Sequence, residues 1–128
     1  MWYNGGKEVK MMDLPRYIAE NYGVTAENLF AKYPGFQVFR HCHNRKWFAV
    51  LMDIPREKLG LTGGNITVVN VKCDSRLIGS FREETGIFPA YHMNKAHWLT
   101  VSLDGTVGDD KLRFLVDMSY DLTKGGKQ

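Results

Sequence analysis

Two short segments carry the residue types that could do chemistry. The first, residues 40–46, reads Arg-His-Cys-His-Asn-Arg-Lys and combines two imidazoles, a thiol and three cations. Alternate side chains of an extended strand share a face, so His41 and His43 would lie on one side and Cys42 on the other. Two imidazoles fall short of the four ligands that zinc usually takes, and a Cys42–His43 nucleophilic pair would point apart. We therefore predict neither a metal site nor cysteine catalysis here.

Two interpretations of this segment remain open. In the first, the polar side chains surround the end of a β-hairpin and simply face water, as most surface charges do. In the second, Arg40, Arg45 and Lys46 contact a nucleic-acid backbone, because arginine binds phosphate through its fork and lysine as a point charge. The second interpretation predicts binding that strengthens at low salt.

The second segment, residues 92–98, reads His-Met-Asn-Lys-Ala-His-Trp. In the functional interpretation this is a ligand-facing loop in which Lys95 binds an anion. In the structural interpretation Asn94 forms a turn, and Trp98 is a buried anchor that fills space against the last helix. We favour burial for Trp98 and leave both roles open for Lys95. The segment also holds two histidines that could titrate near neutral pH, His92 and His97.

The remaining candidate sites are weaker. Asp117 and Asp121 are one helical turn apart, but no base, nucleophile or pocket is predicted beside them, so we expect both on the wet face of the helix. Gly63 and Gly64 lead into a strand without the Lys-Ser/Thr of a phosphate-binding loop. We predict that the protein is not an enzyme and uses no cofactor, metal or small-molecule substrate.

Length and composition set the class. A chain of 128 residues with 44% hydrophobic residues fits one folded domain. It lacks a run of about 20 apolar residues and an apolar signal segment, and its two cysteines suggest no disulfide framework, so we expect a cytoplasmic protein with no membrane segment. The net charge is +3, from 17 basic and 14 acidic residues, which is too mild to indicate nucleic acid by itself.

Periodicity and turn signals predict one domain over residues 13–123, after a loose arm (1–12) and before a flexible tail (124–128). Asp13 should cap a first helix that ends at Gly23, and residues 25–32 should add a helical turn. A strand over residues 46–53 should place Trp47 on one face and Phe48 on the other. The other predicted strands are 36–40, 66–73, 87–92 and 98–103, and the other helices run from Asp74 or Ser75 to near 86 and over 109–122.

These elements follow the order α-β-β-β-α-β-β-α. Short connections favour antiparallel pairing, and three helices can cover one face of five strands. The sequence therefore predicts an α+β two-layer sandwich, with a five-stranded antiparallel sheet and its helices on one face.

The chain resembles the MmcQ/YjbR family of small bacterial proteins over roughly residues 13–123. The most specific wording is Asn-Lys-x-His-Trp at residues 94–98. Further motifs lie at residues 39–41, 46–49, 70–74, 89–95, 103–105 and 119–120. Gly108 stands where family members often have proline. The resemblance implies a fold like that of secretion chaperones and frataxin-like sheet proteins. It marks a family-motif loop formed by His92, Asn94, Lys95, His97 and Trp98, and implies DNA binding through two hairpin wings, a common label for the family.

The expected function is a non-enzymatic binding module, with DNA contacted by basic hairpin tips. The proposed contact residues are Arg40, Arg45, Lys46, Lys72, Arg76 and Lys95. The alternative is a protein-interaction or chaperone-like module, in which an exposed apolar sheet face that includes Phe39 and Val69 binds another protein or a second copy. A continuous basic surface would favour DNA, whereas acidic residues that interrupt it would favour the alternative.

Overall fold

The structure is a computed structural model that describes residues 13–125. The predicted N-terminal arm, residues 1–12, and the last part of the predicted tail, residues 126–128, lie outside the described residues. Five strands form one sheet in the order β1-β2-β3-β5-β4, and every neighbouring pair is antiparallel. The predicted element order is confirmed, with one additional 3-10 turn. The strands are β1 (Gln37–Arg40), β2 (Trp47–Pro55), β3 (Asn65–Lys72), β4 (Ile87–Pro89) and β5 (Trp98–Ser102); the 3-10 turn η1 (Arg56–Leu59) follows β2.

The first helix, α1 (Leu14–Tyr22), begins and ends as its sequence predicts. The Asp13 carboxylate accepts a hydrogen bond from the backbone N–H of Arg16 at 3.2 Å. Gly23 adopts the left-handed conformation (φ +67°) and donates its N–H to the carbonyl of Ala19. Both ends of α1 are therefore fixed by local signals.

Residues 25–32 do not form the predicted helical turn. Instead Glu27 pairs with Val38 of β1, and the two residues exchange backbone hydrogen bonds of 2.9 and 2.8 Å. A short helix is marginal in water, so pairing with an open strand edge is the better use of these backbone groups. The segment thus covers the outer edge of β1.

The other helices are α2 (Ile78–Arg82) and α3 (Asp109–Thr123). The prediction for α3 is confirmed. Helix α2 begins later than predicted, after Leu77, and receives no side-chain cap. The Asp74 carboxylate instead accepts a hydrogen bond from the backbone N–H of Arg76 at 2.9 Å, which forms a turn ahead of the helix.

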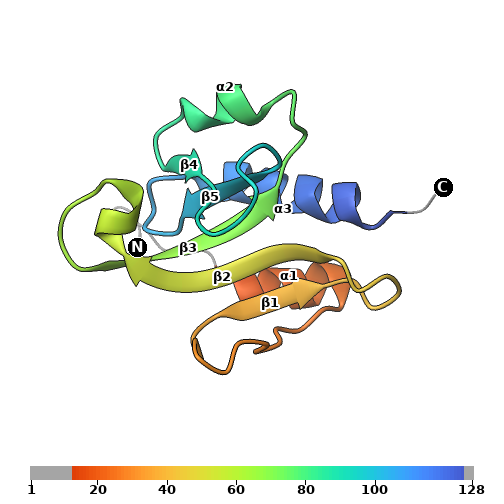
Figure 1. The fold of residues 1–128 in the computed structure, drawn as a ribbon. Helices are drawn as coiled ribbons and strands as arrows, with labels where there is room; N and C mark the ends of the chain where they lie inside the picture. The colour runs from red at the N-terminus through yellow and green to blue at the C-terminus, as the bar shows by residue number, and fades with distance from the viewer. Residues whose placement is uncertain (1–12, 126–128) are drawn as a thin grey trace, which may run out of the picture.

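The helices pack on one face of the sheet, with α1 and α3 behind the strands in Figure 1. Phe39 and Val69 are fully buried on this face, so their predicted place on an exposed face is wrong. The opposite face, which we call the open face, has no α-helix of the described residues over it, and Leu59 of the 3-10 turn η1 packs against it. It carries a second apolar cluster built on Val38, Val50, Met52, Ile54, Ile66 and Val68.

A β-bulge decides which aromatic side chain of β2 enters which layer. Phe39 pairs with Ala49, but the next residue of β1, Arg40, pairs with Trp47, so β2 contains one extra residue there. The bulge turns Phe48 under the helices and Trp47 onto the open face. The predicted alternation, which set Phe48 beside Val50, is wrong at this point.

Trp98 is not the predicted core anchor. Its neighbour Leu99 is fully buried on the helix face, so strand alternation puts Trp98 on the open face, away from α3, where it is only partly exposed. The turn before it is confirmed: the Asn94 side chain accepts from the N–H of Ala96, and the Asn94 carbonyl accepts from the N–H of Trp98.

Across the described residues, no helix has the length and apolar character needed to cross a membrane.

Candidate functional site

The open face contains a pocket of about 350 Å³ between two loops that rise from the sheet. One loop precedes β1, and the other joins β4 to β5. The floor comes from Val50, Met52 and Asn70, with Met93 beside them. Ring-bearing side chains make most of the wall: Phe30, Tyr33, Phe36, Trp47, Tyr91 and His92.

The aromatic wall has a defined packing geometry. The ring of Phe30 meets the rings of Phe36 and Trp47 edge to face, each at a centroid distance of 5.8 Å. Tyr33 stacks on Phe36 at 5.1 Å and leaves 54% of its own surface exposed at the rim. Such contacts are the favoured arrangements of aromatic pairs, so the wall is held in place before any ligand arrives.

A buried amide stands at the floor of the pocket. Asn70, with none of its surface exposed, donates to the carbonyl of Tyr91 at 2.8 Å and accepts from the hydroxyl of Thr100 at 2.5 Å. The same hydroxyl accepts the N–H of Tyr91 at 2.8 Å. These bonds hold the 91–93 segment over the sheet and explain why β4 stops at Pro89 instead of continuing to His92. An amide has two N–H donors and two acceptor lone pairs, so one of each is left without a partner among the described residues.

His92 occupies the rim of this pocket with its backbone in the left-handed region (φ +63°). Residues with a Cβ rarely adopt this conformation, because it brings the Cβ close to the backbone carbonyl. The ring of His92 lies 4.0 Å from that of Tyr91, measured between centroids. A strained residue at a pocket is a common mark of a functional position.

The six basic residues proposed for DNA contact come to one end of the sheet, because β1 and β3 end where β2 and β5 begin. Arg40 forms two hydrogen bonds with Glu27, at 2.9 and 2.7 Å, and they lower the pKa of that carboxyl. Arg76 binds Asp74 at 2.7 Å and lowers the pKa of Asp74 to about 2. The other four form no ion pair among the described residues: Arg45, Lys46, Lys72 and Lys95.

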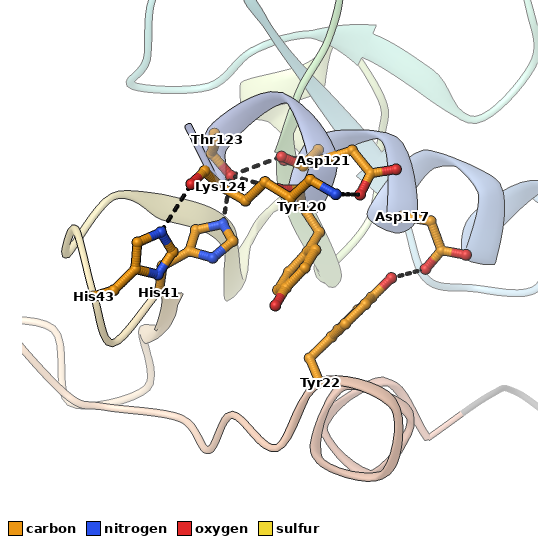
Figure 2. A network of polar contacts seen from close by, with 9 residues as sticks. Tyr22, His41, His43, Asp117, Tyr120, Asp121, Thr123 and Lys124 are labelled. Atoms are coloured by element: carbon orange, nitrogen blue, oxygen red, sulfur yellow. Dashed lines mark hydrogen bonds and ion pairs between the residues drawn. The ribbon is translucent and has the colours of Figure 1, made fainter. Parts of the chain in front are cut away.

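The end of the β1–β2 hairpin is exposed, as predicted, at Cys42, His43, Arg45 and Lys46, but it is also hydrogen-bonded to the end of α3 (Figure 2). His43 Nε2 lies 2.8 Å from the carbonyl oxygen of Lys124, and the Asn44 amide donates to the carbonyl of Thr123 at 2.9 Å. The last carbonyls of a helix have no partner within it, and the hairpin supplies one. Arg45, the next residue of the turn, has its backbone in the left-handed region (φ +66°).

His41 is buried in the aromatic cluster beneath this hairpin. Its Nε2 lies 2.9 Å from Thr123 Oγ1, and that hydroxyl donates to the carbonyl of Ser119 at 2.7 Å. Burial lowers the pKa of His41, and the nearby charges of His43, Lys124 and Lys46 lower it further. The neutral imidazole is therefore the form that the fold accommodates.

We expect acid to destabilise the protein through His41. Its pKa is lower in the folded state than its ordinary value of 6.5, so the unfolded chain binds the proton first. The free energy of unfolding should be constant above that value and fall as the pH drops below it. Urea denaturation between pH 5 and 8 would measure the slope, and His41→Gln should flatten it, whereas exposed His97→Gln should leave it unchanged. Equal slopes in all three proteins would contradict this assignment.

Asp117 does not lie on the wet face of α3 as predicted. Its carboxylate accepts hydrogen bonds from the hydroxyls of Tyr17, at 2.9 Å, and Tyr22 (Figure 2). Burial and this carboxylate raise the pKa of Tyr22. The contact joins α1 to α3.

In the described part of the chain no group of three or more His, Cys, Asp or Glu side chains could hold a metal ion.

The comparisons with known proteins identify the chain's relatives. The YjbR family model matches residues 19–122. This chain belongs to the YjbR family. The uncharacterized protein YyaQ of Bacillus subtilis is 35% identical over 113 residues, which cover 88% of this chain and 96% of YyaQ. The uncharacterized protein YjbR of Escherichia coli K12 is 40% identical over 57 residues, or 44% of this chain and 48% of that protein.

Two solved structures of similar proteins have the same fold as this chain. A crystal structure from Pseudomonas syringae superposes with a TM-score of 0.84 at 42% identity, covering 86% of this chain and 95% of that one. The Deinococcus radiodurans protein DR2400 gives a TM-score of 0.69 at 25% identity, covering 94% of this chain and 83% of its own. The family and the α+β architecture predicted for the chain are therefore confirmed.

The sequence predicted part of the rim of the pocket but neither its wall nor its floor. Among the residues of the motif loop, His92 lines the pocket, and Trp98 lies on the same face of the sheet. Two signals could have led to the remainder. Three aromatic residues at spacings of three flank a Pro-Gly turn in residues 30–36, and Asn70 interrupts an otherwise apolar β-branched strand.

Proposed function

We propose that this YjbR-family protein is a non-enzymatic binding module that receives an apolar segment of a partner protein in its open-face pocket. The observation that carries the proposal is the aromatic wall, which leaves a space of about 350 Å³ above the sheet face that no α-helix of residues 13–125 covers. Concave, mostly apolar pockets with a few polar groups are the usual form of a binding site.

The charge pattern supports a protein partner over DNA. Two of the six cations proposed for DNA contact, Arg40 and Arg76, are paired with carboxylates. Bringing these two residues against phosphate would require breaking their ion pairs, and the adjacent carboxylates would repel the backbone. The hairpin that would serve as a wing is also committed to the end of α3.

Selection from a random 12-residue peptide library tests the proposal. We expect binding peptides, and we expect Tyr33→Ala to weaken their affinity about tenfold, as loss of about 1.4 kcal/mol would. Phe114→Ala is the matched control, because Phe114 is exposed to the same degree (53% against 54%) but lies on α3. The proposal fails if no peptide is selected, or if the two variants bind the selected peptides equally.

DNA binding is the second candidate, favoured by the four cations at one end of the sheet that form no ion pair within residues 13–125. Fluorescence anisotropy of a labelled 30-base-pair duplex across salt concentrations would test it. If phosphates are contacted, affinity should fall steeply with salt, and Arg45→Glu should reduce both affinity and the salt dependence. Duplex binding that Arg45→Glu leaves intact would count against this candidate, as would its absence at low salt.

A further inference from the structure

We infer that the pocket takes a single tryptophan or tyrosine side chain from a peptide segment whose flanking residues are acidic. This inference rests on the proposed function and specifies the chemistry of the partner. Its basis is the joint arrangement of an aromatic wall, a partly satisfied amide at the floor and a group of cations at one end of the pocket.

The wall and floor favour a large aromatic side chain with a single polar atom. Edge-to-face contacts with Phe30, Phe36 and Trp47 suit a ring, and the free donor and acceptor capacity of Asn70 suits one indole N–H or phenol O–H. A nucleobase has several polar edge atoms. Most of these would face apolar atoms in this pocket, and a buried polar atom without a partner is costly.

The cations lie where they can meet the flanks of such a segment. Lys95 follows Met93 of the lining by two residues. Lys72 is two residues beyond Asn70 on β3, so its side chain leaves the same face of the sheet, and its partner on β5 is Trp98. Their summed potential attracts acidic residues and repels basic ones.

The His92 side chain at the rim of the pocket can be removed without changing the backbone there. The backbone of His92 is in the left-handed region (φ +63°), which glycine adopts without strain. His92→Gly should therefore remove the ring and keep the backbone conformation. We expect this variant to unfold at the same or a slightly higher temperature and to bind the peptide more weakly. Because its stability is not reduced, weaker binding cannot be ascribed to misfolding.

Three labelled peptides test the inference by fluorescence anisotropy: a central tryptophan with two acidic residues on each side, the same peptide with alanine at the centre, and the tryptophan peptide with lysine flanks. We expect the acidic tryptophan peptide to bind at least tenfold more tightly than the other two. Lys72→Glu should weaken its binding about tenfold and strengthen binding of the lysine-flanked peptide. Lys58→Glu, at η1 beyond the opposite end of β2, should change neither.

Each outcome decides a different claim. Equal affinity for acidic and basic flanks overturns this inference but leaves the proposed function standing, provided that library peptides still require Tyr33. If neither Tyr33→Ala nor His92→Gly changes the affinity for the peptides, the inference and the proposed function are both overturned. Displacement of the acidic peptide by a five-nucleotide single strand at equal concentration would instead identify the occupant as a nucleic acid and overturn the inference.

Discussion

Replacing Phe48 with alanine should lower the free energy of unfolding by about 3–5 kcal/mol, the cost of removing a fully buried aromatic side chain. The ring of Phe48 contacts the rings of Tyr120, His41 and Tyr22 at centroid distances of 5.0, 5.1 and 5.9 Å. It therefore lies where α1, α3 and β2 meet, and the cavity left behind would separate all three. Urea denaturation of the variant and the parent protein gives the difference directly.

Trp47→Ala is the control for this prediction. Trp47 is the larger residue and the immediate neighbour of Phe48, but the bulge directs it to the pocket wall, where it stays partly exposed. We expect it to lower stability less than Phe48→Ala does, and to weaken peptide binding. A larger loss of stability from Trp47→Ala would mean that the two aromatic side chains occupy the opposite layers.

Gly86→Ala should lower the free energy of unfolding by about 2–4 kcal/mol, from backbone strain and overpacking together. Gly86 has φ +90°, and a Cβ on it would lie 2.7 Å from Cγ2 of Val107 and 3.1 Å from Oγ of Ser102. Neither the conformation nor the space suits a side chain. Thermal or urea denaturation of the variant measures the loss.

Gly79→Ala in α2 is the same substitution at a position where it should raise the free energy of unfolding. No atom lies within 4 Å of the position that a Cβ would take there, and alanine is a better helix former than glycine by about 0.5–1 kcal/mol. The two variants should therefore change stability in opposite directions. A shift of the same sign in both would disprove the role assigned to Gly86.

Elements with local signals were the ones that the sequence predicted well. Asp13 and Gly23 fix the ends of α1 through contacts within a few residues, so their roles could be read from the chain alone. The bulge in β2 could not be predicted, because its single extra residue is defined only against β1. Because of that one residue, Trp47 and Phe48 lie on the faces opposite to those predicted. Trp47 therefore forms part of the pocket wall, and Phe48 lies in the core under the helices.

The candidate site was hard to predict for a related reason. Its wall and floor come from parts of the chain that are far apart, residues 30–36, 47–52, 70 and 91–93, and only tertiary pairing brings them together. The cations were identified from their positions in the sequence, but whether each is paired depends on contacts such as that between Arg40 and Glu27, 13 residues apart. Trp98 was misplaced because aromatic size suggests burial, whereas strand alternation decides the direction of the side chain.

The joining of the β1–β2 hairpin to α3 bears on how the protein is made in the cell. His41 and Thr123 are 82 positions apart, so a nascent chain emerging from the ribosome exposes the hairpin long before its partner has been synthesised. Until then Phe48 and the neighbouring aromatic side chains have no helix over them, and such surfaces attract chaperones or aggregate. Completion of this domain is therefore expected to wait until the last turn of α3 has left the ribosome.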